Sequence, residues 1–368
     1  MEVIELTTSD RSRWNDFVAR NPHGDVLQCW EWGEVKGEGG DWTPICMAAT
    51  DSAGAIRAGV LLLRRRVPLV GAFYYAPRGP LMDDWSDART LKLLIDAVEK
   101  RAQADGAAFL KIDPAVPVDD ERAEIALSAL GFHNPPTVDP QGFGGTQPRC
   151  VMVLDVKGKD DAALLADFKA QCRRNIRKSD KFGVEVIEET TREHIDPFYE
   201  LLSVTAKRDG FTVRPKRYYE TIWDKLVEAG YAKLFLTRHE GVYLSGALCF
   251  VIGDKCWYVY GASSNESRDV MPNYGMQWAM IRWAREQGCR VYDFRGVSPR
   301  RRQEGEDAQA LEQEDHLQGL NRFKEGFGAR YVEYIGERDL AFNVVKYWTW
   351  NNAKPAAAAF LRRLRGKR

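Results

Sequence analysis

The chain has 368 residues, and its 53 basic and 53 acidic side chains cancel, so no overall field selects a polyanionic partner. Hydrophobic residues make up 44%, enough for packed cores, and the length favours two domains over one. Seven scattered cysteines without a CxxC pair, together with five histidines, argue against a disulfide framework or a structural zinc site. A polar N-terminus and the lack of an apolar run of ~18 residues argue against a signal peptide and a membrane span.

The first half of the chain alternates strand-like and helix-like segments. Residues 58–63 and 71–75 have strand character, whereas residues 90–103 carry apolar side chains at helical spacing. Gly106 ends that helix, and residues 107–114 predict a strand closed by a proline.

The same order recurs later in the chain. Residues 245–251 and 256–261 predict two strands, 277–287 predict a helix, and 290–296 predict a further strand. Two hairpin–helix–strand units indicate two domains of one α/β type, unless the weak likeness is a coincidence. The glycine-containing run 142–148 predicts the loop between them. The sequence has no long heptad repeat, so a coiled-coil arm is not expected.

A row of cations marks the start of the second unit. Residues 160–181 predict one helix, on which Lys169, Arg173 and Arg177 recur every four residues and so share one side. A solvated surface and a surface that follows nucleic-acid phosphates both produce such a row.

The most informative segment is GLNRFKEGFG at residues 319–328. Lys324 lies there between Phe323 and a bend with two glycines, which predicts a mobile cation beside a backbone that a substrate can approach closely. A second cluster, at 207–219, combines cations with tyrosines. It suits phosphate binding, because arginine offers a two-pronged donor and tyrosine a hydroxyl and a stacking face, and the alternative is a charged loop between domains. A third cluster, at 28–37, holds two tryptophans and a glutamate, for which the alternative is simple packing at the start of a helix.

Together these segments resemble the Fem family of aminoacyl transferases, which carry amino acids from aminoacyl-tRNA to peptidoglycan precursors. The likeness covers roughly residues 1–345 and is strongest at 28–37, 147–183, 208–218, 260–264 and 319–328. It implies an α/β (α+β) fold of two tandem acetyltransferase-like (GNAT-like) domains. The first comprises residues 1–148 completed by the C-terminal segment 329–368, and the second comprises residues 149–328.

The resemblance also implies roles for single residues. Lys324 and its neighbour Phe323 are expected at the catalytic centre, and Asp113 is expected to meet the acceptor amine. The alternative for Asp113 is that it caps the turn before Pro114. The expected precursor-binding residues are Lys36, Arg214, Tyr218, Tyr75 and Tyr260, and the expected tRNA-binding residues are Lys169, Arg173 and Arg177.

The two strand tyrosines have an alternative explanation, because Tyr75 and Tyr260 would serve equally well as buried aromatic residues that close a core.

The implied reaction is attack by a precursor amine on the ester of a charged tRNA, which forms an amide. An amine with a pKa near 10.4 is almost fully protonated at pH 7, so its deprotonation costs on the order of 4–5 kcal/mol. Asp113, or groups of the tRNA itself, would relay that proton, and Lys324 would stabilise the oxyanion. No metal, cofactor or covalent intermediate is expected, since aminoacyl-tRNA is the co-substrate.

Two other functions compete with this one. Residues 103–108 match the letters of the pyrophosphate loop of acetyl-CoA-dependent N-acetyltransferases, but they end a predicted helix instead of opening one. A non-catalytic RNA- or membrane-binding protein is the second alternative. The tail, 352–368, is apolar and then basic, as in a solubilising terminus or an attachment to anionic membrane.

We therefore expect a monomeric enzyme, either cytoplasmic or peripheral at the inner face of the membrane. Its precursor would be a UDP-linked or a lipid-linked muropeptide.

Overall fold

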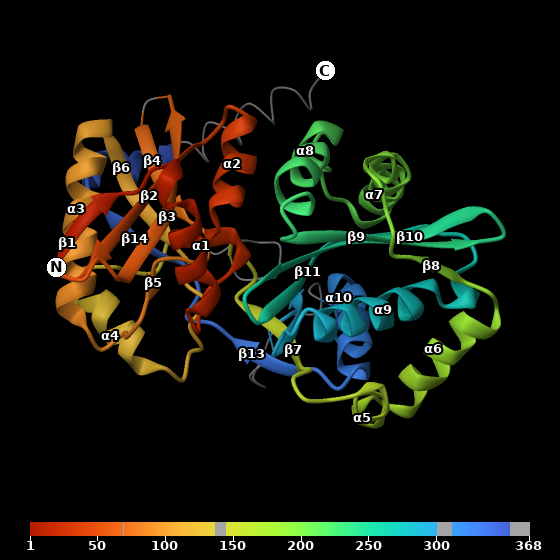
Figure 1. Ribbon diagram of the computed structural model, residues 1–368. Coiled ribbons are helices and arrows are strands. Elements are labelled where there is room, and N and C mark those ends of the chain that lie inside the picture. The colour runs from red at the N-terminus through yellow and green to blue at the C-terminus, as the bar shows by residue number, and fades with distance from the viewer. Residues whose placement is uncertain (69, 137–144, 300–310, 354–368) are drawn as a thin grey trace, which may run out of the picture. The chain divides into compact units, whose positions relative to one another are not determined.

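Tertiary contacts divide the chain into two compact units. The first holds Met1–Arg149 and Tyr334–Arg368, and the second holds Cys150–Glu333. The computed structural model describes residues 1–68, 70–136, 145–299 and 311–353, so residues 142–144 of the predicted loop 142–148 and residues 354–368 of the tail 352–368 lie outside the described residues. Each unit is built on its own seven-stranded mixed sheet (Figure 1).

The sheet of the first unit has the strand order β1-β2-β3-β4-β6-β14, with the short β5 beside β3. Its pairs are antiparallel except for the parallel pair β4–β6. The strand bounds are β1 Glu2–Glu5, β2 Thr43–Thr50, β3 Ile56–Val67, β4 Gly71–Ala76, β5 Leu81–Met82, β6 Ala107–Ile112 and β14 Arg338–Ala341. The last strand of this sheet therefore comes from the end of the chain, after the whole second unit.

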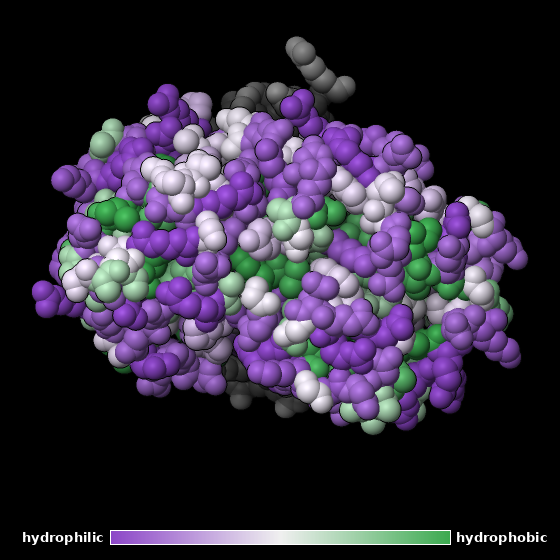
Figure 2. All heavy atoms as spheres, in the orientation of Figure 1, coloured by the Kyte–Doolittle hydropathy of each residue, from purple (hydrophilic) through white to green (hydrophobic). Residues whose placement is uncertain are grey.

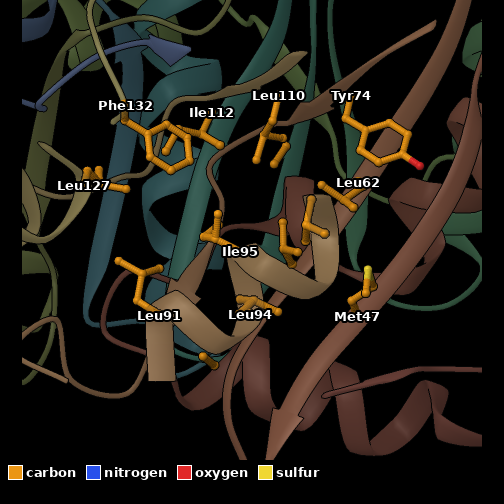
Figure 3. Packing of buried hydrophobic residues seen from close by; sticks show 14 of the residues in the cluster. Met47, Leu62, Tyr74, Leu91, Leu94, Ile95, Leu110, Ile112, Leu127 and Phe132 are labelled. Atoms are coloured by element: carbon orange, nitrogen blue, oxygen red, sulfur yellow. The ribbon is translucent and has the colours of Figure 1, made fainter. Parts of the chain in front are cut away.

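Helix α3 (Ala88–Asp105) makes the crossover between the parallel strands β4 and β6. The side chain of Asp87 accepts a hydrogen bond from the backbone of Thr90 at its start, and Gly106 ends it in a left-handed conformation at φ 68°. Its apolar face packs against the sheet, where Leu91 and Leu94 belong to the same cluster as residues of β2, β3, β4 and β6 (Figure 3). The letters that match a pyrophosphate loop thus fall at the C-terminus of a helix.

The remaining helices of the first unit are short. They are α1 Arg11–Arg20, α2 Trp30–Glu38, α4 Glu121–Ala129 and α11 Val344–Trp348. Tyr347 of α11 packs on Phe109 of β6, with ring centroids 5.3 Å apart, in a second cluster apart from that of α3.

The sheet of the second unit repeats this plan in the order β13-β7-β12-β11-β10-β9-β8. Strands β9, β10 and β11 are antiparallel, and helix α9 (Pro272–Glu286) then leads to β12, which runs parallel to β11. The bounds are β7 Cys150–Asp155, β8 Glu185–Ile187, β9 Ala232–His239, β10 Val242–Ile252, β11 Lys255–Ser263, β12 Val291–Gly296 and β13 Arg330–Glu333. The predicted repeat is confirmed, because β2-β3-β4-α3-β6 and β9-β10-β11-α9-β12 have one topology.

The helices of the second unit cover both faces of its sheet. Figure 1 shows α7 and α8 on one face and α9 and α10 on the other. The bounds are α5 Asp161–Asp167, α6 Ala170–Lys181, α7 Ile195–Asp209, α8 Lys216–Ile222 and α10 Leu311–Gly326. The longest helix among the described residues is α3, with 18 residues, so this part of the chain contains no coiled-coil arm.

Three sequence-based expectations need correction. Residues 160–181 are not one helix, because Phe168 is extended (ψ 145°) between α5 and α6 and its ring packs on those of Trp278 and Phe327. Burying a phenylalanine stabilises a fold by roughly 1.5–3 kcal/mol, more than the ~1 kcal/mol of a helical hydrogen bond. The chain returns to the first unit at Tyr334 and not at residue 329, because β13 pairs with β7.

The third correction concerns β3, which continues to Val67, four residues beyond the predicted end at residue 63. On the face drawn in Figure 2, hydrophilic residues predominate and hydrophobic ones appear in small separate groups. Among the described residues, no helix combines the length and apolarity that crossing a bilayer requires.

Candidate active site

Lys324 lies in the last turn of α10 and is buried, with 3% of its surface exposed. Its Nζ donates hydrogen bonds to the main-chain carbonyls of Gly296 at 2.6 Å and Arg295 at 3.3 Å. Burial lowers the pKa of Lys324 to about 7, and the charge of Asp293 opposes that shift. The structure therefore shows a fixed ammonium, with two of its three N–H donors engaged, and not the expected mobile cation.

The carbonyls that hold Lys324 belong to a strained turn at the end of β12. Arg295 has a positive φ of 59°, which is rare for a residue with a side chain. Its backbone N–H donates to Oδ1 of Asp293 at 2.6 Å, and its guanidinium lies 5.6 Å from the ring centre of Trp257. Arg295 was not among the predicted site residues, although the two opposite charges inside the strand segment VYDFRG were a usable signal.

Three predicted substrate-binding residues come together in the second unit. The hydroxyls of Tyr218 on α8 and Tyr260 on β11 are 3.0 Å apart, and the guanidinium of Arg214 lies 5.5 Å from the ring centre of Tyr218. Burial raises the pKa of Tyr260, and the hydrogen bond with Tyr218 and the charges of Arg214 and Arg295 act against this rise. Arg295 therefore acts electrostatically on the same phenol as Arg214.

A cavity of about 460 Å³ opens within the second unit between α7, β11, α9 and α10. Phe323 forms part of its wall, with Tyr258, Arg208, Arg268 and Gln277 among the other lining residues. Strand β11 pairs with β12 only through Lys255–Trp257, and its later residues from Tyr258 to Ser263 contribute to the cavity wall. Phe323 is the immediate chain neighbour of Lys324, so one face of the last turn of α10 meets the cavity and another carries the ammonium.

A glycine gives this cavity part of its shape. A Cβ atom added to Gly261 would lie 1.7 Å from the hydroxyl oxygen of Tyr258, so no larger residue is compatible with that tyrosine position. The absence of a side chain at Gly261 leaves room for the Tyr258 side chain to lie along its own strand, where it lines the cavity.

In the first unit, Tyr75 and Asp113 meet directly. The Tyr75 hydroxyl donates to Oδ2 of Asp113 at 2.7 Å, and the backbone N–H of Arg78 donates to Oδ1 at 2.6 Å. Asp113 is buried, and this burial raises its pKa to about 6 against the charge of Arg78 and both hydrogen bonds. Both carboxylate oxygens of Asp113 therefore accept hydrogen bonds, one from Tyr75 and one from Arg78. The alternative role predicted for Asp113 was to cap the turn before Pro114. Tyr75 is buried as well, as its core alternative predicts.

Lys36, the remaining predicted precursor ligand, lies in the last turn of α2. Its Nζ is 4.4 Å from the ring centre of Trp32, within the range of a cation–π interaction. Its phosphate-binding role stays a prediction.

The predicted tRNA-binding row does not act as one stripe. The guanidinium of Arg173 donates to the carbonyls of Leu165, at 3.3 Å, and Phe168, and so closes the C-terminal end of α5. Lys169 pairs with Glu325 at 3.4 Å, and Arg177 is exposed. Contact of the row with tRNA stays a prediction, for which Lys169 and Arg177 are better placed than Arg173.

The described part of the chain shows no group of three or more His, Cys, Asp or Glu side chains arranged to hold a metal ion. All seven cysteines are buried and none forms a disulfide bond. Burial raises the pKa of Cys172 to about 12, so this thiol is a poor nucleophile.

Known proteins resemble this chain over nearly its whole length. The model of the FemAB family matches residues 10–237 and 230–355. The Lipid II:glycine glycyltransferase of Staphylococcus haemolyticus (strain JCSC1435) is 30% identical over 436 aligned residues, which cover 100% of this chain and 100% of that protein. Because that alignment is longer than this chain, the relative carries segments that are missing here.

Solved structures agree with this likeness. The crystal structure of FemX superposes with a TM-score of 0.82 at 30% identity, covering 96% of this chain and 100% of that one. A tandem GNAT protein from the clavulanic acid biosynthesis pathway superposes with a TM-score of 0.52 at 14% identity, covering 93% and 98%, a likeness of fold alone. The predicted fold of two tandem GNAT-like domains is confirmed, and the chain belongs to the FemAB family.

Proposed function

We propose that this FemAB-family transferase moves an amino acid from aminoacyl-tRNA to an amine of a peptidoglycan precursor. The amine nitrogen attacks the ester carbonyl carbon, the bond from that carbon to the ribose oxygen breaks, and an amide forms. The departing ribose oxygen takes up a proton, and the attacking amine loses one. The ester is already activated, so the protein must mainly stabilise the oxyanion and manage these protons.

The observation that carries the proposal is the fixation of Lys324 beside a cavity wall. Two carbonyls hold two N–H donors of its ammonium, and we assign the third donor to the oxyanion of the tetrahedral intermediate. A donor that is already oriented and shielded from water stabilises a developing charge more than a flexible lysine on the surface would. Phe323, in the wall of the cavity, would border the aminoacyl group.

Asp113 is our candidate to receive the proton of the acceptor amine. Its pKa of about 6 leaves it ionised at pH 7 but closer to neutrality than an ordinary aspartate, which favours proton exchange with an amine. Tyr75 and the backbone of Arg78 fix both its oxygens. Recognition of the diphosphate would fall to Arg214, Tyr218 and Tyr260, which combine a guanidinium with two hydroxyls, and to Lys36.

The names of relatives direct the choice of substrates. Two staphylococcal proteins, 30% and 31% identical to this chain, are called Lipid II:glycine glycyltransferases. We therefore propose the lipid-linked precursor as the acceptor and glycine as the first amino acid to test. Action at the membrane surface and attachment through the basic tail are part of this proposal.

A reconstituted transfer assay tests the proposal. Purified protein is mixed with glycyl-, alanyl- or seryl-tRNA and with either the lipid-linked or the UDP-linked muropeptide, and the product mass is measured. We expect one added residue that depends on intact tRNA. Lys324→Met should lower kcat about 10²- to 10³-fold with little change in KM. Transfer from acetyl-CoA, with none from any charged tRNA, would instead establish the N-acetyltransferase alternative.

A further inference from the structure

Helix α11 presents apolar side chains to solvent close to the end of the described chain. Val344 and Val345 are each 75% exposed, and Trp348 is 61% exposed. These three residues, the α11 patch, stand at positions i, i+1 and i+4, so they share one side of the helix. The other large hydrophobic residues that are exposed in the described part of the chain lie singly along the sequence. A cluster of exposed apolar residues marks an interaction surface, whereas scattered ones are ordinary.

The opposite side of α11 holds the helix in place. The Tyr347 hydroxyl donates to Oδ2 of Asp339 at 2.8 Å, and the Tyr347 ring packs on Phe109. At the start of the helix, Oδ1 of Asn343 accepts a hydrogen bond from the backbone N–H of Lys346 at 3.0 Å. The α11 patch is not part of the apolar cluster that Tyr347 and Phe109 share. The packing of α11 on the sheet therefore does not explain why the exposed residues are apolar.

Positive charge borders the α11 patch. Lys346 lies in the same helix, and its Nζ donates to the carbonyl of Gly106 at 3.4 Å. A Cβ atom added to Gly71 would lie 3.4 Å from the same Nζ, so the end of the β3–β4 hairpin is adjacent, and Arg66 is exposed there. From residue 340 to residue 368 the sequence holds seven lysines or arginines and no aspartate or glutamate. The surface thus combines an apolar centre with a surplus of cations.

These features fit the surface of a lipid bilayer with anionic headgroups. Tryptophan favours the headgroup region, aliphatic side chains enter the boundary of the acyl chains, and cations are attracted to anionic lipid. An RNA would meet the cations but offers the valines no apolar surroundings. A protein partner would bury the apolar residues but requires no such run of like charge. The bilayer is the partner that both parts of the surface favour.

We propose that the α11 patch inserts into the interface of an anionic lipid bilayer, while the neighbouring lysines and arginines attract the protein to the headgroups. This inference rests on the proposed function, in which a lipid-linked precursor is the acceptor, and it adds α11 to the basic tail as a membrane contact. Burial of apolar groups depends little on salt at moderate concentration, whereas attraction to anionic lipid weakens as the Debye length shortens. Salt therefore separates the two contributions.

Co-sedimentation with vesicles measures this binding in the absence of tRNA and precursor. Full-length wild-type protein and the triple variant Val344→Ser, Val345→Ser and Trp348→Ser are mixed with vesicles of phosphatidylcholine alone or of equal parts phosphatidylcholine and phosphatidylglycerol. We expect the wild type to bind the anionic vesicles more tightly than the neutral ones, and less tightly as salt is raised. The triple variant should bind the anionic vesicles roughly 10- to 100-fold more weakly at every salt concentration, because it loses the apolar contribution.

Matched variants separate insertion from nonspecific attachment. Val118 and Ile125 are also exposed hydrophobic residues of the first unit, so the double variant Val118→Ser and Ile125→Ser should bind like the wild type. Deletion of residues 354–368 should remove most of the salt dependence and leave the effect of the triple substitution in place. Urea unfolding checks that each variant is folded, and Trp348→Ser alone replaces the triple variant if that one does not fold.

The outcomes distinguish the two proposals. Absence of wild-type binding, or equal binding by wild type and triple variant, would refute the role of α11 and leave the proposed function intact. An effect of the substitutions that appears only after the tail is deleted would also refute it, because the tail would then cover the α11 patch in the intact protein. Loss of tRNA affinity in the triple variant, with vesicle binding retained, would assign the surface to RNA. Failure of the wild-type protein to transfer an amino acid from any charged tRNA would overturn the proposed function without changing the vesicle result.

Discussion

Lys324 and Asp113 are ionisable residues whose surroundings bring their pKa values toward neutrality from opposite directions. Burial lowers the pKa of the lysine to about 7 and raises that of the aspartate to about 6. Each residue is buried, and each is held by hydrogen bonds that fix its direction. Groups tuned in this way suit proton transfer and charge stabilisation near pH 7.

Asp113→Asn should change the pH dependence of transfer. In the wild-type protein we expect kcat/KM to fall as pH drops through about 6, because the Asp113 carboxylate becomes protonated and can no longer accept the proton of the amine. The variant should be roughly 10²- to 10⁴-fold slower and should lack this acidic limb. Initial rates between pH 5 and 8 measure the effect. An unchanged acidic limb in Asp113→Asn would assign it to another group.

Lys324→Met should change how stability depends on pH. The pKa of Lys324 is lower in the folded state, so as pH falls from about 10.5 to 7 the unfolded chain binds a proton that the folded chain does not. The free energy of unfolding of the wild-type protein should therefore decrease relative to that of the variant, by at most ~1.4 kcal/mol per pH unit.

Urea unfolding of both proteins at pH 7, 8, 9 and 10 measures this difference. Lys92→Met is a suitable control, since the Lys92 side chain is 60% exposed and its ammonium stays in water. A difference between wild type and Lys324→Met that is constant with pH would show that Lys324 is not desolvated.

At the scale of elements, the predictable parts were those fixed by short stretches of sequence. Helix α3 and strands β4, β6 and β12 follow from local periodicity and from stops such as Gly106. The break at Phe168 was not predictable, because it depends on Phe327, a residue far away in the sequence. The Arg295 turn was missed for the same reason, since Lys324 comes from another element.

The candidate site shows the same division. The resemblance predicted Arg214, Tyr218 and Tyr260 as site residues. Only the bulge at Val259, an extra residue in the pairing of β10 with β11, explains why Tyr260 faces the other two. The commitment of Arg173 to α5 was invisible in a charge pattern, because a helical row has the same spacing whatever its side chains bind.

The cation row yields a prediction about elements. Arg173→Ala should destabilise the protein by about 1 kcal/mol, since the C-terminal carbonyls of α5 lose their donor, and should change tRNA binding little. Glu substitutions at Lys169 and Arg177 should leave stability nearly unchanged but flatten the dependence of tRNA affinity on salt by about 0.7–0.9 log units per lost contact. Binding titrations at several salt concentrations, with urea unfolding in parallel, separate the two effects. An unchanged salt slope in the Lys169/Arg177 double variant would favour the solvated surface.

At the scale of the molecule, the two units differ in how the chain builds them. The second unit is one continuous segment, Cys150–Glu333, whereas the first is assembled from Met1–Arg149 and the segment after Tyr334. We expect a fragment of residues 150–333 to fold alone and to unfold cooperatively in urea. A fragment of residues 1–149 should not, because it lacks β14 beside β6 and the ring of Tyr347 on Phe109.

Circular dichroism and urea titration of the two fragments measure this difference. Adding residues 334–368 in trans should restore cooperative unfolding to the 1–149 fragment. Cooperative unfolding of 1–149 by itself would show that β14 contributes little.

The late arrival of β14 has a consequence for how the protein is made. A ribosome adds roughly 5–20 residues per second, so the interval between synthesis of Ile112 in β6 and Arg338 in β14 is on the order of 10–45 seconds. During that time the apolar β6 presents an unpaired edge, the kind of surface that pairs with other chains. A message cut short before codon 338 would yield a chain whose first sheet cannot be completed. Proteases would degrade such incomplete chains, so only full-length protein would accumulate in the cell.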